Sequence, residues 1–378
     1  MKITFLGTHG QFNIGDELLL ETFLAQLGKE HHYAVNSYDP DFTRQALQPQ
    51  FSVETFHTTG ELRRFLHHLL TSDLLVFGGG SIIKELYASV GRNPYSTLAM
   101  ILATVTFTKL LARKKVIMSN IGVGPLMTPF GHFLARVILN QVDFLSVRDD
   151  QSLDTCLRIG LNPARVRRVP DAVFANAPQV FISEALTIHP HGKLHVALNL
   201  NYDIENRAAW EGFLENLAEA LRSWNQQQGL VLHALPMQSK FKKNDDLTVL
   251  KDFLRRLPEI DQIIHDPQTA QEAAGILAGC DLVLAERLHT LVIASILGKP
   301  FFGLVYDVKV RELVEYLGMT DYSLDINQPF SAETLHAGLV RMEQNRTPVQ
   351  IHLLARSRAL RAELSAYFAE LRAKFISA

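Results

Sequence analysis

Three basic residues in the second half of the chain could act together on an anion. Arg287 and His289 stand in the string ERLHTLVIASILGKP, between a strand-like and a helix-like apolar run, and Lys309 follows the next strand-like run. Because the carboxyl ends of adjacent parallel strands lie at one edge of a sheet, we expect these side chains to converge there. A guanidinium matches phosphate or carboxylate oxygens, a helix N-terminus favours an anion, and an imidazole can transfer protons near neutral pH. The spacing therefore predicts an anion site, with the neighbouring Glu286 as a further ligand-binding candidate.

A fourth basic candidate stands in the first half of the chain. Arg148 follows the strand-like run Phe144–Val147, so it should lie at the carboxyl end of a strand. Its guanidinium could bind a phosphate or carboxylate, or it could be held in a salt bridge by Asp149 or Asp150, and the sequence leaves both open. Asp171 follows another strand-like run, and there a helix-capping role is favoured over a ligand contact.

The first strand-like run ends in the glycine-rich string GTHGQFNIGDELLL. Glycines before a helix start leave backbone N–H groups available to an anion, and Gly15 is placed for this. The pattern is not GxGxxG, however, and Asp16 at the first turn would repel a phosphate. A tight turn with Asp16 as the N-cap is the equally open alternative, and Asn13 could instead contact a sugar or a nucleotide. The predicted substrate-binding residues of this turn are Asn13, Gly15 and Asp16.

Further glycines stand at the ends of two central strand-like runs. Three successive glycines precede Ser81, and Gly122 stands in the string SNIGVGP. Residues without a Cβ allow another group to approach the backbone closely, and we favour a ligand over a neighbouring loop. The predicted substrate-binding residues in this broad acceptor site are Gly79, Gly80, Ser81 and Gly122.

Strand-like and helix-like runs alternate along most of the chain, which predicts an α/β fold with parallel sheets covered on both faces. A weakly periodic segment, 176–192, interrupts the alternation, and we place a domain boundary there. The predicted organisation is a doubly wound, Rossmann-like N-terminal domain at 1–180 on the acceptor side, a second one at 190–330, and C-terminal helices at 331–378. The clearest predicted strands are 2–7, 73–77, 115–120, 144–147, 194–200, 230–235, 262–265, 281–285 and 301–305.

Three helices are predicted in more detail. Apolar residues at steps of three and four predict a helix with one buried face, formed by Phe130, Phe133, Leu134, Val137 and Ile138. A later helix is predicted to have Asp266 as its N-cap, Pro267 as its first residue and Gly279 just past its end. The apolar stretch 97–112 is too short to cross a bilayer, so we predict a buried helix there.

The composition excludes several classes of function. The net charge of -2 gives no general field for nucleic acid or for an anionic membrane, so any site for an anion must be local. The two cysteines, Cys156 and Cys280, suit a reducing compartment. No zinc-protease or P-loop motif occurs, and the paired histidines are interpreted as structural or solvated. They are His31, His32, His67, His68, His189 and His191.

The strings NIGDELLL, GGGS, SNIGVGP, SVRDDQS and ERLHTLVIASILGKP resemble those of the polysaccharide pyruvyl transferases, over roughly residues 1 to 310. The resemblance implies a fold like that of the two-domain GT-B glycosyltransferases and pyruvate transfer from phosphoenolpyruvate to a sugar, without metal or cofactor. The family's essential basic residues correspond to Arg148, Arg287, His289 and Lys309. For this chemistry we hypothesise that the two arginines hold phosphate and carboxylate, Lys309 neutralises the leaving phosphate and His289 transfers protons. The acceptor sugar stays open.

Two other functions remain open from the sequence. A GT-B glycosyltransferase could use Glu286 and the downstream Gly-Lys-Pro for a nucleotide sugar, and a non-catalytic module would bind a sugar or an anion without turnover. The expected location is the cytoplasm. A lipid-linked saccharide acceptor would additionally require peripheral contact with the inner face of the membrane.

Overall fold

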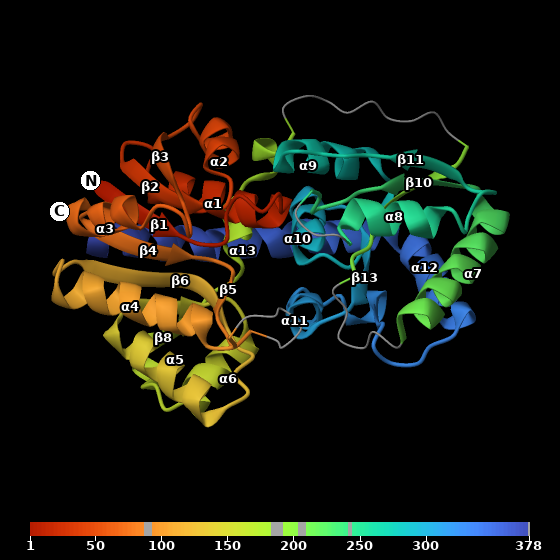
Figure 1. Ribbon diagram of the computed structural model, residues 1–378. Helices are drawn as coiled ribbons and strands as arrows, with labels where there is room; N and C mark the ends of the chain where they lie inside the picture. Colours follow the sequence, from red (N-terminus) through yellow and green to blue (C-terminus); the bar gives the residue numbers. More distant parts are fainter. Residues whose placement is uncertain (87–92, 183–191, 203–208, 241–243, 377–378) are drawn as a thin grey trace. The chain divides into compact units, whose positions relative to one another are not determined.

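The computed structural model describes residues 1–86, 93–182, 192–202, 209–240 and 244–376. They form two compact units (Figure 1). The first unit comprises residues 1–11, 16–175 and 363–378, and the second comprises residues 12–15 and 176–362. The C-terminal helices are thus divided between the units, and the short segment 12–15 belongs to the second unit although it lies near the start of the chain. The predicted histidines His189 and His191 lie outside the described residues.

The first unit contains a parallel sheet with the strand order β3-β2-β1-β4-β6-β7-β8, and β5 pairs with β6. The reversal of direction at β1 and β4 is that of a doubly wound fold. The predicted strands at 2–7, 73–77, 115–120 and 144–147 are confirmed. The bounds are β1 Lys2–Leu6, β2 His32–Ser37, β3 Ser52–His57, β4 Leu74–Gly78, β5 Ser81–Ile83, β6 Lys115–Val123, β7 Phe144–Val147 and β8 Val166–Arg168.

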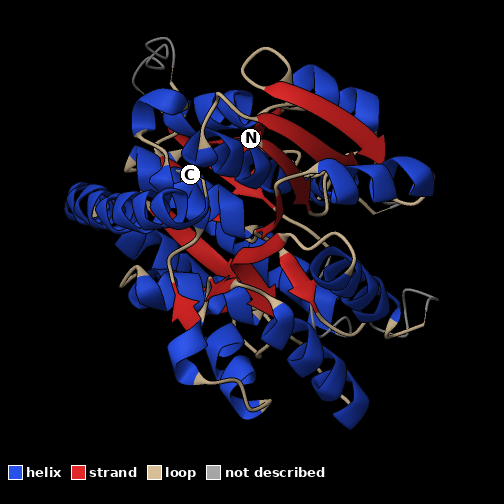
Figure 2. Cartoon of the chain, turned by 90° about the vertical axis from the view of Figure 1, so that its left-hand side faces the viewer, coloured by secondary structure: helices blue, strands red, loops and turns tan. Residues whose placement is uncertain are grey.

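Helices cover the strands of this sheet, as Figure 2 shows. They are α1 Ile14–Leu27, α2 Pro40–Leu47, α3 Leu62–Thr71, α4 Ser96–Leu110, α5 Pro129–Gln141 and α6 Asp150–Arg158. Side chains of α4 and α5 share one apolar core with alternate residues of β4 and β6, so both helices cover the same face of the sheet. The last part of α13 (Arg346–Phe375) also belongs to this unit, where the Tyr367 hydroxyl lies 2.6 Å from Ser119 Oγ and 2.7 Å from Ser146 Oγ.

The second unit contains another parallel sheet, with the strand order β11-β10-β9-β12-β13-β14. Its strands are β9 Leu194–Asn199, β10 Leu230–Ala234, β11 Asp261–Ile264, β12 Leu282–Ala285, β13 Phe301–Val305 and β14 Ser323–Asp325. Its helices are α7 Trp210–Gln228, α8 Asp246–Leu254, α9 Ala270–Gly279, α10 Leu288–Leu297, α11 Val308–Tyr316 and α12 Ala332–Gln344, followed by the first part of α13. The strands predicted in this half are confirmed, and with them the α/β fold of two Rossmann-like sheets.

Two helix predictions were wrong in part. In α5, Leu134 and Ile138 are buried as predicted, but Phe130 and Phe133 are 52% and 58% exposed. In α9 the N-cap is Thr269, whose side chain accepts a hydrogen bond from Glu272 N, because Pro267 lies in the preceding loop instead of in the first turn. Asp266 is therefore not the cap, and Gly279 is the last helical residue.

The apolar stretch 97–112 forms the helix α4 as predicted, but only one face of this helix is buried. Leu98, Ile101 and Val105 are buried, whereas Met100 and Leu110 are 49% and 68% exposed. Within the described residues, no helix is both long enough and apolar enough to cross a bilayer.

A partly buried acid near the start of α1 predicts how the stability of the first unit depends on pH. Burial raises the pKa of Glu17 from 4.5 to about 8, opposed by the N–H of Gly10, which donates to Glu17 Oε1 at 2.7 Å. Since the folded chain holds this proton more tightly than the unfolded chain, stability should fall as the pH rises from about 4.5 to 8. In the Glu17→Gln variant the amide oxygen can still accept from Gly10, and the pH dependence due to this side chain is lost. In urea unfolding, the free energy of unfolding of Glu17→Gln should exceed that of wild type by an amount that grows by up to ~1.4 kcal/mol per pH unit between about pH 4.5 and 8. Equal unfolding free energies of the two proteins at every pH would contradict this prediction.

Candidate active site

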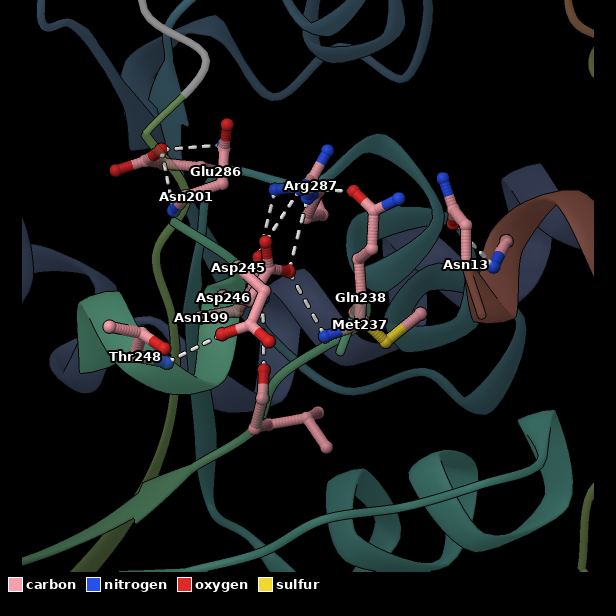
Figure 3. A network of polar contacts seen from close by, with 12 residues as sticks. Asn13, Asn199, Asn201, Met237, Gln238, Asp245, Asp246, Thr248, Glu286 and Arg287 are labelled. Carbon is pink, nitrogen blue, oxygen red and sulfur yellow. Dashed lines mark hydrogen bonds and ion pairs between the residues drawn. The ribbon is translucent and has the colours of Figure 1, made fainter. Parts of the chain in front are cut away.

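The second unit brings together the polar side chains that follow four of its strands. Asn199 ends β9, Gln238 and Asp246 lie in the connection from β10 to α8, Arg287 follows β12, and Tyr306 follows β13. These strands are adjacent and parallel, so their carboxyl ends lie at one edge of the sheet. This edge is the candidate active site, and Figure 3 shows most of its side chains.

Arg287 is fixed at the centre of this site by an ion pair. Its Nη2 lies 2.5 Å from Asp246 Oδ1, its Nε donates to Asp246 Oδ2 at 3.1 Å, and its Nη2 also contacts Gln238 Oε1 at 3.2 Å (Figure 3). Two parallel hydrogen bonds to one carboxylate fix the plane of a guanidinium as well as its position. The Asp246 side chain is 1% exposed and that of Arg287 14%, so the pair is poorly screened by solvent.

The carboxylate of Asp246 is itself held in place. Met237 N donates to Asp246 Oδ2 at 3.1 Å, and Asp246 N donates to Gln238 O at 3.1 Å. The preceding Asp245 caps α8 by accepting from Thr248 N at 2.8 Å. Asp246 is thus a positioning residue for Arg287 that the sequence analysis missed. The only sequence signal was an acidic pair just before a helix, which is the ordinary pattern of an N-cap.

The junction after β12 is organised by two asparagines. Arg287 N donates to Asn199 Oδ1 at 2.9 Å, which fixes the residue before the first turn of α10. Glu286 is fully buried, and its Oε2 accepts from the backbone N and the Nδ2 of Asn201 at 3.1 and 2.6 Å. Figure 3 shows Glu286 directed toward Asn201. The structure therefore assigns Glu286 contacts with the protein, and its predicted contact with substrate remains a prediction.

His289 lies in the first turn of α10 and packs against the segment 12–15. Ile14 N donates to Met237 O at 2.9 Å, and Asn13 forms an antiparallel bridge with Gln238, so this segment adds to the connection after β10. A Cβ placed on Gly15 would overlap the imidazole of His289. The predicted residues Asn13 and Gly15 therefore belong to the same site as His289, and Asn13 Oδ1 accepts from Gly15 N at 3.0 Å.

Lys309 lies in the first turn of α11, beside the end of β13. Its Nζ is 3.0 Å from Asp307 Oδ2 and 5.2 Å from the centre of the Tyr306 ring. Burial raises the pKa of Tyr306, while the positive charges of Lys309 and Arg287 act in the opposite direction. Because β12 and β13 are adjacent parallel strands, Arg287 and Lys309 lie at the same edge of the sheet. Tyr306 and Asp307 were not among the predicted residues.

Arg148 lies in the first unit, at the carboxyl end of β7. Its side chain is 8% exposed, Nη2 donates to Ser81 Oγ at 3.0 Å, and Nε lies 3.3 Å from Asp149 Oδ2. Of the open alternatives, a salt bridge with Asp149 is therefore present, and Asp150 pairs with Arg168 instead. That Arg148 acts on the same substrate as Arg287 remains a prediction.

The other predicted residues of the first unit have contacts within the protein. Leu19 packs against Gly79, and Ser81 packs against Gly122, whereas a Cβ on Gly80 would meet only atoms at 3.8 Å. The close approaches at Gly79 and Gly122 are thus made by side chains of the protein, and substrate contact by these residues and Ser81 remains a prediction.

Two acids of the first unit have roles near helix starts. Asp16 lies inside α1, so it is not the N-cap, and its Oδ2 accepts from Thr8 Oγ1 at 3.4 Å. Asp171 Oδ1 accepts from Val173 N at 3.0 Å, which agrees with the favoured capping role.

No group of histidine, cysteine or acidic side chains able to hold a metal ion occurs in the parts of the chain that the structure describes. Cys156 and Cys280 are both buried free thiols, and burial raises the pKa of each to about 12. His68 is likewise buried, packs on Phe56, and has its pKa lowered to about 4 by burial. Cys156, Cys280 and His68 are therefore packed in the protein interior and are not candidates for the active site.

The contact between Gly15 and His289 predicts a change of activity from a very small substitution. In Gly15→Ala the new methyl group would overlap the His289 ring, which must then rotate or shift. Alanine is otherwise favourable in a helix by roughly 0.5 to 1 kcal/mol, so the unfolding free energy should not fall by more than about 1 kcal/mol. We expect turnover to fall by on the order of tenfold or more, since misplacement by about 1 Å of a reacting group can cost 10²-fold. Unchanged turnover in this variant would show that the position of His289 is unimportant.

Comparison with known families identifies the class of protein. Residues 13–308 match the family model described as polysaccharide pyruvyl transferase, so the chain belongs to this family. The match ends one residue before Lys309.

A relative of the chain is the amylovoran biosynthesis protein AmsJ of Erwinia amylovora. It is 21% identical over 281 residues, a match that covers 70% of this chain and 64% of AmsJ. The match therefore spans less than two thirds of that relative.

Solved structures show the same fold. The Anabaena protein Alr3699/HepE in complex with UDP is 14% identical with a TM-score of 0.65, over 100% of both chains. The UDP-GlcNAc 2-epimerase of Neisseria meningitidis bound to UDP-GlcNAc is 11% identical with a TM-score of 0.63, over 99% of this chain and 100% of that one. A glycosyltransferase from Rickettsia africae is 11% identical with a TM-score of 0.65, over 100% of this chain and 98% of that one. These similarities define a GT-B-like fold.

Proposed function

We propose that this protein transfers pyruvate from phosphoenolpyruvate to two hydroxyl groups of a sugar, forming a ketal and releasing phosphate. The observation that carries the proposal is the arrangement of Arg287, His289 and Lys309 at one edge of the second sheet. Phosphoenolpyruvate carries a phosphate and a carboxylate, and two cations beside a proton-transferring group meet its charge requirements. Membership of the polysaccharide pyruvyl transferase family supports the same reaction.

The proposed reaction begins with protonation of the methylene carbon of phosphoenolpyruvate, which becomes the methyl group of the ketal. The adjacent carbon then has oxocarbenium character, and a sugar hydroxyl attacks it and loses its proton. The bond from this carbon to the phosphate oxygen breaks, phosphate leaves with the electron pair, and a second hydroxyl closes the ring. One hydroxyl proton replaces the proton used on the methylene carbon, and the other leaves with phosphate.

Each basic residue has a part in this proposal. Arg287, held by Asp246, binds an anionic group of the donor, and Lys309 neutralises the phosphate as it leaves. His289 transfers a proton, with its ring positioned by Gly15. Arg148 is assigned the second anionic group. Fixed charges at positions where charge develops are among the largest contributions to catalysis, and here they need no metal or cofactor.

The acceptor is proposed to be a saccharide of a cell-surface or secreted polysaccharide, bound by residues of the first unit. Phosphoenolpyruvate is a cytoplasmic metabolite, so we propose that the enzyme acts in the cytoplasm. A nucleic acid is not proposed as a partner, since the net charge is only -2.

One observation favours a second function, glycosyl transfer from a nucleotide sugar. The similar Anabaena structure contains UDP, and it has the same fold as this chain. In that function Glu286 would bind the nucleotide, but its carboxylate is fully buried and accepts hydrogen bonds from Asn201.

The two functions are separated by their products. The protein is incubated with mixed saccharide acceptors and either phosphoenolpyruvate or a panel of nucleotide sugars, and released phosphate and nucleoside diphosphate are measured. Acceptor-dependent phosphate release from phosphoenolpyruvate alone would support pyruvyl transfer. Nucleoside diphosphate release would support glycosyl transfer, and binding of either donor without turnover would indicate a non-catalytic module.

A further inference from the structure

The outward surface of α4 and α5 in the first unit is unusually apolar for a protein surface. The largest exposed apolar side chains there are Met100, Leu110, Leu111, Met127, Phe130 and Phe133, with exposed fractions from 49% to 69%. The remaining exposed positions of α4 are Ser96, Ala99 and Ala103, so its outward side carries no charge up to Leu110. Exposed apolar clusters of this kind mark sites where a protein binds a partner or a membrane.

These residues form one continuous surface because the two helices lie side by side in the same direction (Figure 1). Near their starts, the rings of Tyr95 and Phe130 are 5.0 Å apart, and near their ends Thr106 Oγ1 donates to Gln141 Oε1 at 3.1 Å. Both helices pack on the same core, so their exposed positions point away from it together. We call this surface the α4–α5 face.

The segment that forms the α4–α5 face carries basic residues but no acidic ones. The acid that contacts the start of α5, Glu85, is 1% exposed and accepts hydrogen bonds from Thr128. Residues 93–142 contain no aspartate or glutamate. Lys109 and Lys115 pair with Asp143 at 2.7 and 3.1 Å, just beyond that range. Among the described residues, none forms an ion pair with the remaining cations of the face, which are Arg113, Lys114 and Arg136.

We propose that the α4–α5 face docks on the surface of an anionic lipid bilayer. Exposed phenylalanine, leucine and methionine side chains would enter the boundary between headgroups and acyl chains, while arginine and lysine bind lipid phosphates. Lysine and arginine side chains near an anionic membrane strengthen binding, and the apolar side chains add the free energy of leaving water. The inference goes beyond the proposed reaction and does not depend on it. Only its purpose, access to a lipid-linked acceptor, rests on the proposed function.

Vesicle binding without any substrate tests this proposal. The full chain should sediment with vesicles of equimolar phosphatidylcholine and phosphatidylglycerol, and less with phosphatidylcholine alone. Binding should weaken with added salt, because salt screens the cations. The double variant Phe130→Ser/Phe133→Ser should bind at least about tenfold more weakly, since two apolar anchors are lost. Arg113→Gln/Lys114→Gln should reduce binding only to the anionic vesicles.

A matched control is available in the second unit. Ile263 and Ile264 are 41% and 47% exposed, and Ile263→Ser/Ile264→Ser should bind vesicles like wild type. A direct reporter is Phe133→Trp, whose fluorescence should shift to shorter wavelength on binding and be quenched by brominated lipid. The native Trp210 and Trp224 are 8% and 1% exposed, so they give a constant background.

Three outcomes would overturn the proposal. They are wild-type protein that does not bind the anionic vesicles, unchanged binding by the Phe130/Phe133 variant, and a concentration-dependent dimer of wild type that this variant abolishes. The last would assign the face to a second copy of the chain. Phosphate release with a water-soluble acceptor should be unchanged in the Phe130/Phe133 variant, which keeps a failure of the docking proposal separate from a failure of the proposed reaction.

Discussion

The Arg287→Ala variant is expected to release phosphate from phosphoenolpyruvate about 10² to 10³ times more slowly than wild type. This is the usual loss of rate when one fixed donor that stabilises a developing charge is removed. The substitution also leaves the carboxylate of Asp246, 1% exposed, without its cation. Removing one partner of a buried ion pair costs about 3 to 5 kcal/mol, so the unfolding free energy should fall as well. Steady-state kinetics and urea unfolding of the same preparation measure both effects.

A second substitution separates the loss of activity from the loss of stability. Adding Asp246→Asn to Arg287→Ala removes the buried charge, so stability should largely return while activity does not. Asp246→Asn alone should have a smaller effect on the rate, since Arg287 stays present but loses part of its fixation. The control is Arg256→Ala, which breaks an exposed pair with Glu211 and should change neither property by more than about 0.5 kcal/mol. Recovery of activity in the double variant would show that Arg287 only neutralises Asp246.

The His289→Ala variant is expected to turn over about 10² to 10⁴ times more slowly than wild type, because this is the usual contribution of a positioned acid or base. The urea midpoint should change little, because His289 is partly exposed in the first turn of α10. The substitution leaves space beside Gly15, so added imidazole should restore part of the activity.

Imidazole rescue distinguishes proton transfer from a structural role of His289. Imidazole should not rescue Arg287→Ala, which serves as the control for unspecific effects of the additive. Full phosphate release by His289→Ala without imidazole would reject the role assigned to this residue.

Much of the second unit could be predicted from the sequence because its signals are local. Fully buried parallel strands give continuous apolar runs, and charged residues directly after such runs are conspicuous. That is why Arg287, His289 and Lys309 were found, and why their position at one sheet edge followed from the parallel topology.

The partners of these residues could not be predicted, because they depend on contacts between distant parts of the chain. Asp246 meets Arg287 across 41 positions, and the segment at Gly15 meets His289 from the opposite end of the sequence. Nothing in the local pattern distinguishes Asp246 from an ordinary residue at a helix start. The glycines before Ser81 were ambiguous in a similar way. A glycine without a Cβ lets a protein side chain such as Leu19 approach the backbone as closely as a ligand would, so the sequence does not distinguish the two.

The apolar periodicity of α5 was misleading for a physical reason. Phe130 and Phe133 follow the helical spacing of Leu134 and Ile138, but they lie on the outer edge of the apolar stripe and pack on Tyr95 and on each other. Periodicity gives the direction of the stripe and not its buried width. An apolar residue on an exposed face therefore shows the same helical spacing in the sequence as an apolar residue in the core.

The most direct test of the central claim is mass spectrometry of saccharides incubated with the protein and phosphoenolpyruvate. The proposal predicts an acceptor that gains the mass of one pyruvate less one water, as a ketal requires, together with one phosphate released per ketal formed. It also predicts that both products are lost in His289→Ala. An acceptor that instead gains a hexose mass from a nucleotide sugar, with no phosphate released from phosphoenolpyruvate, would contradict it.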